Sequence, residues 1–84
     1  MILLFILSIN MEIIKEKNRV YIYENKLIAE MTFPNVDENT VCIDHTFVDE
    51  SLRGMGIAAK LMEAALEVII ENGYNVTLSC TYAI

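Results

Sequence analysis

A strand-like run and a helix-like run meet at a short glycine-containing turn, and this junction limits the folds open to the chain. Residues 41–48 are rich in strand-forming side chains, and residues 57–71 carry apolar side chains at helical spacing. The turn, residues 53–56 (Arg-Gly-Met-Gly), has two glycines that let the backbone bend tightly and come close to a ligand. The unpaired N–H groups and positive dipole end of the helix would face this turn, where Arg53 adds a cation. The residues therefore predict a phosphate-type anion held at a helix N-terminus.

Two other phosphate loops fit this turn less well. A Walker A loop is excluded because neither Gly-Lys-Ser nor Gly-Lys-Thr follows the glycines. The dinucleotide fingerprint needs a third glycine where this chain has Ala59, and an acidic residue where the next strand ends in Ser79 and Cys80. The plain structural alternative is a glycine turn between strand and helix that binds nothing and carries an exposed arginine.

The Arg-x-x-Gly-x-Ala spacing of residues 53–58 resembles the R/Q-x-x-G-x-G/A signature of the GCN5-related N-acetyltransferases, the GNAT superfamily. Residues 45–61 and the Cys-Thr-Tyr step at 80–82 are similar to the minimal-size, NATD1-like group of that superfamily, and the similarity extends over residues 12–83. The resemblance implies an enzyme that transfers acetyl from acetyl-CoA to an amine acceptor, with no metal. Its loop would grip the pyrophosphate of the cofactor.

The resemblance also implies roles for individual residues. His45, the only histidine of the chain, is a candidate base, with a half-buried structural histidine as the alternative. Cys80 is a candidate nucleophile through an acyl-cysteine, or a small buried hydrophobe. Tyr82 would give a proton to the departing CoA thiolate. The implied cofactor contacts lie at the strand end and in the loop: Phe47, Val48, Arg53, Gly54, Met55, Gly56, Ile57 and Ala58.

The fold class expected is α+β, a GNAT-like mixed sheet. Strands are predicted over residues 19–23, 26–33 and 40–48 as an antiparallel meander, with a lead-in over 12–17 and a loop over 34–39. One main helix, residues 57–71, follows the third strand and returns the chain to a parallel final strand. The C-terminal helix that the resemblance implies has no counterpart before residue 84. The helix also has a wide apolar sector, which favours a homodimer or another covering element.

Size and charge narrow the functional classes. A chain of 84 residues makes one domain, expected over residues 11–84 after an apolar extension at 1–10 that is too short to cross a bilayer. A net charge of −6 argues against nucleic acid and suits a cationic acceptor. Cys42 and Cys80 lack the spacing of metal ligands. They suit a reducing cytoplasm, although a disulfide between them stays open.

Two rival functions follow from the same residues. A non-catalytic acyl-CoA-binding module would keep the loop but lack turnover. A small interaction protein would instead use the wide apolar helix and the apolar N-terminal residues as a partner surface. Binding of acetyl-CoA is expected of the enzyme and of the acyl-CoA-binding module but not of the interaction protein. Turnover distinguishes the enzyme from the module.

Overall fold

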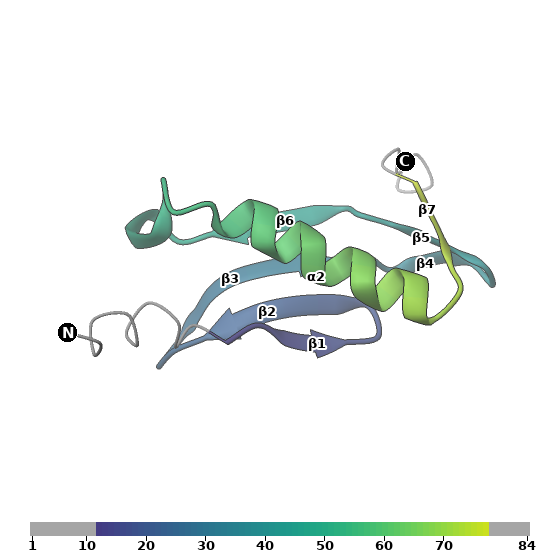
Figure 1. Cartoon of the computed structure of the whole chain (residues 1–84), viewed down its shortest axis with the longest axis horizontal. Coiled ribbons are helices and arrows are strands. Elements are labelled where there is room, and N and C mark those ends of the chain that lie inside the picture. The colour runs from purple at the N-terminus through teal and green to yellow at the C-terminus, as the bar shows by residue number, and fades with distance from the viewer. Residues whose placement is uncertain (1–11, 78–84) are drawn as a thin grey trace.

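The computed structural model describes residues 12–77, and the elements named below lie within that range. In chain order they are β1 (Ile14–Glu16), β2 (Arg19–Tyr23), β3 (Leu27–Thr32), β4 (Asn35–Asp37), β5 (Thr40–Cys42), β6 (His45–Val48), the 3₁₀-helix η1 (Glu50–Leu52), the α-helix α2 (Ile57–Glu71) and β7 (Asn75–Thr77) (Figure 1). None of the helices described is long and apolar enough to cross a membrane. The predicted extension at residues 1–10 lies outside the described residues.

The strands form two sheets, and together they confirm the mixed α+β fold. One sheet has the order β1-β2-β3-β6 with every neighbouring pair antiparallel. The other has the order β4-β5-β7, in which β7 runs parallel to β5. Helix α2 separates β5 and β6 from β7 in the chain, so it supplies the crossover that a parallel pair requires.

The single strand predicted over residues 40–48 is wrong in one respect, because the structure divides it into β5 and β6. The division falls where the backbone changes its sheet partner: the Ile43 N–H donates to the Thr77 carbonyl at 3.2 Å, and the Asp44 N–H donates to the Thr32 carbonyl at 3.3 Å. The predicted loop over residues 34–39 contains β4, and the predicted lead-in contains β1. Pro34, which has no N–H to donate, separates β3 from β4.

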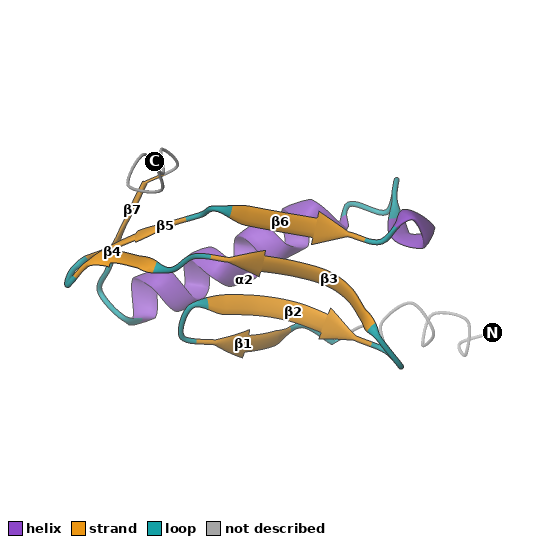
Figure 2. Ribbon diagram, turned by 180° about the vertical axis from the view of Figure 1, so that it is seen from behind, coloured by secondary structure: helices purple, strands orange, loops and turns teal. Residues whose placement is uncertain are grey.

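The core lies between the first sheet and α2. Alternate residues of β2 and β3 are buried toward the helix, among them Val20, Ile22, Ala29 and Met31. Helix α2 packs against β1, β2, β3, β6 and β7 and buries Ile57, Leu61, Ala64, Ala65, Val68 and Ile69. Figure 2 shows α2 behind the sheet, with no described helix on the face toward the viewer. The face of the first sheet that packs against α2 therefore contributes to the core, and no described helix covers its other face, called the open face below.

The apolar sector of α2 is only partly covered. Ile69 is buried, whereas Ile70 remains 74% exposed and Leu66 is also exposed. Glu67, on the same helix, is exposed, and its Oε1 pairs with Lys15 Nζ at 2.7 Å.

Candidate functional site

The site begins with a short capped turn after β6. Asp49 precedes η1, and its Oδ2 accepts hydrogen bonds from the Ser51 N–H at 3.1 Å and the Ser51 hydroxyl at 2.6 Å. This is the bonding expected of an aspartate at the start of a helical turn. The hydrogen bonds from Ser51 lower the pKa of the Asp49 carboxyl, and the nearby charges of Lys26 and Arg53 act in the same direction. The carboxylate thus fixes the direction in which the chain enters the glycine turn.

Two glycines in left-handed conformation carry the chain from η1 into α2. Gly54 has φ 84° and Gly56 has φ 71°, a region that other L-residues rarely adopt. A Cβ built on either glycine would meet no atom within 4 Å, so the protein leaves the space beside them open. Both glycines are needed for the turn, and both leave the backbone accessible to a ligand.

The helix N-terminus keeps its backbone donors unpaired. Gly56 is the N-cap of α2, and no side chain caps the helix. Within residues 12–77, no hydrogen bond is donated by the N–H groups of Gly54, Gly56, Ile57, Ala58 and Ala59. Water or a ligand must satisfy such donors, and a phosphate group fits them through both hydrogen bonding and the helix dipole.

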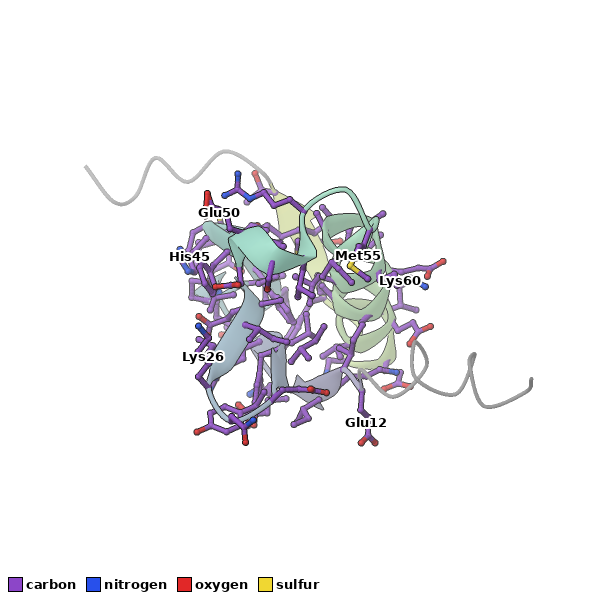
Figure 3. All side chains as sticks on the ribbon, turned by 90° about the vertical axis from the view of Figure 1, so that its left-hand side faces the viewer. Glu12, Lys26, His45, Glu50, Met55 and Lys60 are labelled. Atoms are coloured by element: carbon purple, nitrogen blue, oxygen red, sulfur yellow. The ribbon has the colours of Figure 1, made fainter. Side chains whose placement is uncertain are left out.

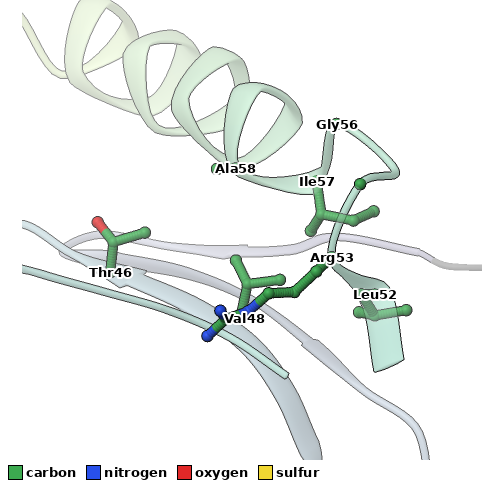
Figure 4. Close-up of a pocket in the computed structure, with 8 residues that line it drawn as sticks. Thr46, Val48, Leu52, Arg53, Gly56, Ile57 and Ala58 are labelled. Atoms are coloured by element: carbon green, nitrogen blue, oxygen red, sulfur yellow. The ribbon is translucent and has the colours of Figure 1, made fainter. Parts of the chain in front are cut away.

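A cleft of about 390 Å³ opens beside this helix end, between α2 and β6 (Figure 4). The residues that line it are Thr46, Val48, Leu52, Arg53, Gly54, Gly56, Ile57 and Ala58. Arg53 extends into the cleft from the loop, and its guanidinium forms no ion pair with any residue that the structure describes. Among the described residues, a cation without an ion-pair partner therefore lies beside N–H groups without an acceptor.

The side of the cleft formed by β6 offers more backbone groups. Strand β6 pairs with β3 on one edge and has no described strand on the other. The Asp49 N–H donates to the Ile28 carbonyl at 2.8 Å, and the alternation of antiparallel pairing then turns the N–H and C=O of Thr46 and Val48 toward the open edge. An extended amide-containing ligand could pair with this edge as an added strand does.

The structure brings most of the predicted cofactor residues to this cleft, but two of them lie elsewhere. Phe47 points to the opposite sheet face, since neighbouring strand residues alternate, and it is 37% exposed there. Met55 is 50% exposed and is not among the residues that line the cleft. Thr46 and Leu52 also line the cleft, and neither was predicted from the sequence. The same alternation that places Val48 in the cleft could have identified Thr46.

Of the three predicted catalytic residues, the structure describes His45 alone. His45 lies on the open sheet face, away from Met55 and the helix (Figure 3), and its side chain is 54% exposed. Its nearest charged partner is Glu30, with 3.7 Å between Nε2 and Oε1. Cys80 and Tyr82 lie outside the described residues. Among residues 12–77 there is no group of three or more His, Cys, Asp or Glu side chains that could hold a metal ion.

Comparison with known proteins gives a consistent result. A family model described as GCN5-related N-acetyl-transferase matches residues 19–84. Protein NATD1 of Xenopus tropicalis is 35% identical over 54 residues, which are 64% of this chain and 50% of that protein; human Protein NATD1 has the same identity and is covered to 48%. The chain thus spans about half the length of the curated relatives that it matches.

Solved structures show the same similarity in three dimensions. The solution structure of a GCN5-like protein from Staphylococcus aureus matches with a TM-score of 0.66 and 39% identity, over 88% of this chain and 74% of that one. Glucosamine-6-phosphate N-acetyltransferase from Arabidopsis thaliana matches with a TM-score of 0.55 at 20% identity, over 96% of this chain and 59% of that one. The latter likeness concerns the fold alone.

Proposed function

The chain belongs to the GCN5-related N-acetyltransferases, and from that premise we propose that it transfers the acetyl group of acetyl-CoA to an amine acceptor. The family supports acetyl transfer in general. The use of acetyl-CoA and of an amine are the parts proposed for this chain. We also propose that the reaction takes place in the cytoplasm.

One observation carries the proposal: N–H groups at the start of α2 that have no acceptor among the described residues, and the Arg53 cation, which has no ion-pair partner among them, border the same cleft. These groups suit the pyrophosphate of acetyl-CoA, whose negative charges need several donors at once. The open edge of β6 begins next to them and suits the amide-containing pantetheine arm. The donor set and the shape of the cleft therefore fit the two halves of the cofactor.

Within this proposal each part of the site has a task. Arg53 and the N–H groups of Gly54 and of residues 56–59 hold the phosphates, while the β6 edge orients the arm that bears the acetyl thioester. Acetyl-CoA supplies an activated acyl group, so the protein mainly has to position the two substrates and move protons. His45 is proposed as the base for the acceptor. Cys80 and Tyr82 keep the roles of nucleophile and acid as proposals from the sequence.

The test combines binding and turnover on the full chain. Acetyl-CoA is titrated calorimetrically, and release of the CoA thiol is then followed with three amine acceptors: a lysine peptide, a peptide with a free N-terminus and a polyamine. Saturable binding with amine-dependent thiol release supports the enzyme. Binding with no thiol release above the rate without amine favours the acyl-CoA-binding module, and absence of binding by the folded chain contradicts both readings.

The variant Cys80→Ala sharpens the distinction between enzyme and module. If Cys80 is a nucleophile, we expect thiol release to fall by at least about 100-fold while acetyl-CoA affinity is retained. If Cys80 only packs, turnover should change little in a folded protein. Both quantities are measured on the same preparation, so a loss of folding would be visible as a loss of binding.

A further inference from the structure

Three neighbouring strands bring an arginine, a glutamate and the only histidine together on the open face of the first sheet. Arg19 lies on β2, Glu30 on β3 and His45 on β6. Glu30 pairs with Phe47 in the sheet register, and His45 pairs with Thr32, so Glu30 and His45 are diagonal neighbours on one face. This cluster is on the side of the sheet opposite α2 and outside the residues that line the cleft.

The two carboxylate oxygens of Glu30 are divided between the two partners. Oε2 lies 2.9 Å from Arg19 Nε, an ion pair whose angle is not that of a hydrogen bond, and Oε1 lies 3.7 Å from His45 Nε2. The Arg19 guanidinium also stacks on the Tyr21 ring at 3.9 Å. Glu30 is only 16% exposed. The carboxylate is therefore held on one side by a fixed cation and presents its other oxygen to the imidazole.

The distances decide what this arrangement can do. A separation of 3.7 Å is too long for a hydrogen bond, so the contact is weak while the imidazole is neutral. It becomes an ion pair when His45 takes a proton, and the low exposure of Glu30 limits screening by solvent. A carboxylate placed in this way can orient the imidazolium ring through Nε2 once the other ring nitrogen, Nδ1, has accepted a substrate proton.

We propose that Glu30 is a positioning residue for His45 in acetyl transfer: it pairs with Nε2 of the imidazolium that forms when Nδ1 accepts a proton from the acceptor ammonium, and Arg19 holds Glu30 in place. The inference rests on the proposed function for its chemical meaning. His45 begins β6, about 10 Å along the strand from Val48. The start of β6 is thus the end farther from the phosphate-binding loop, where an arm lying along the strand would carry its thioester.

The proton balance is complete without another reagent. The acceptor ammonium gives one proton to His45 Nδ1, and its freed nitrogen forms the C–N bond to the acetyl carbon. The C–S bond of the thioester, which links the acetyl group to CoA or, once the acyl-cysteine has formed, to Cys80, then breaks, and the second proton lost from the nitrogen goes to the departing thiolate. His45 returns its proton to water, so the sum is an amide, a thiol and one proton released.

The test compares Glu30→Gln with the wild-type chain at pH 5, where an imidazole is protonated. Because the chain has one histidine, three-bond couplings to its ring carbon report its χ1 populations without ambiguity. We expect one dominant rotamer in the wild type, and a ratio of major to minor rotamer about fivefold lower in Glu30→Gln. Equal populations in the two proteins would overturn the proposal. Glu67→Gln, an isosteric change in an ion pair on the opposite side of the molecule, should leave the rotamers unchanged.

Steady-state kinetics distinguish an effect of Glu30 through His45 from a general structural effect of the substitution. Glu30→Gln should lower kcat about fivefold with an unchanged KM for acetyl-CoA, and it should have no further effect in a His45→Asn background. Equal losses in both backgrounds would show that Glu30 does not act through His45, which contradicts the proposal. Absence of turnover in a wild-type chain that binds acetyl-CoA would instead contradict the proposed function, while the rotamer comparison would still decide whether Glu30 orients the ring.

Discussion

A left-handed glycine lies at each end of α2, with φ 71° at Gly56 and 70° at Gly73. The two ends differ in whether their backbone groups have hydrogen-bond partners. At the C-terminal end, the N–H groups of Gly73 and Tyr74 donate to the carbonyls of Ile70 and Ile69, each at 3.0 Å. This is a Schellman motif, which closes the helix on itself. At the N-terminal end no side chain caps the helix. Its first donors have no acceptor among the described residues.

The same left-handed glycine conformation therefore serves two purposes in this chain. A left-handed glycine at the C-terminal end satisfies orphan carbonyls and so contributes to stability. A left-handed glycine at the N-terminal end leaves orphan N–H groups beside a cleft and the Arg53 cation. The first arrangement needs no ligand. The second leaves donors that, on our account, acetyl-CoA satisfies.

The largest effect on the open end is expected for Arg53→Ala. Loss of a charged partner for phosphate should weaken acetyl-CoA binding by about 1.5–3 kcal/mol, or roughly 10- to 150-fold in Kd. Isothermal titration measures the change. Lys26→Ala is the matched control, because it removes one positive charge from a side chain outside the cleft lining. Unchanged affinity in a folded Arg53→Ala protein, or an equal loss in Lys26→Ala, would refute the assignment of the loop.

Gly56→Ala and Gly73→Ala together test whether the glycine at the N-terminal end of α2, unlike the one at its C-terminal end, contributes to ligand binding. Both substitutions force a left-handed residue to carry a Cβ in open space, so each should destabilise the fold by about 1–2 kcal/mol. Chemical denaturation measures this common cost. Only Gly56→Ala should also weaken acetyl-CoA binding, by about tenfold, because its Cβ stands where the ligand approaches the backbone. Equal affinity in the two variants would mean that the glycine at the open end is structural alone.

A smaller effect is expected from the cap that precedes the glycine turn. The pKa of Asp49 is lowered by its hydrogen bonds from Ser51, so its contribution is present above the ordinary carboxyl range near 4 and is lost as the pH falls through the lowered pKa. Asp49→Ala should lack this contribution at neutral pH, with reduced thermal stability and slightly weaker acetyl-CoA binding. The difference in stability between the two proteins should shrink on acidification. A constant difference down to pH 3 would contradict the role of the carboxylate.

The smallest effect on stability and binding is expected for the exposed ion pair between Lys15 and Glu67, which lies away from both ends of α2. Glu67 raises the pKa of Lys15 through their hydrogen bond and opposite charges, but the pair is exposed. Any stabilisation is therefore present at neutral pH and is lost only as the pH rises through the raised pKa of Lys15. Lys15→Gln should leave the thermal midpoint and the acetyl-CoA affinity unchanged within error. A clear loss of affinity would show that binding depends on the whole helix rather than on its open end.

Local sequence signals predicted the parts of the molecule that local forces decide. The bounds of α2 follow from its apolar periodicity and from the Asn72-Gly73 stop, and the structure reproduces them. The change of partner between Ile43 and Asp44 depends on two different sheets. No pattern within the strand could reveal it, which is why one predicted strand became two.

At the candidate site, too, the residues placed by local turns were predicted, and those placed by contacts between elements were not. The turn glycines and Arg53 were predicted from their spacing and line the cleft, because the turn itself places them there. Leu52 lines the cleft because η1 turns the chain back toward the core, and no sequence pattern predicted that short helix. Glu30 was missed as a partner of His45 because strand register, not chain distance, makes them neighbours.

The most direct measurement is a titration of the ¹⁵N-labelled chain with acetyl-CoA, followed through its backbone amides. We expect the largest shifts on Gly54 and on the first turn of α2, residues 56–59, with smaller shifts along the open edge of β6. The amides of Gly73 and Tyr74 should stay in place, because their hydrogen bonds are already made. Shifts of equal size at both ends of the helix, or none at its N-terminal end, would contradict the claim that this end is the cofactor site.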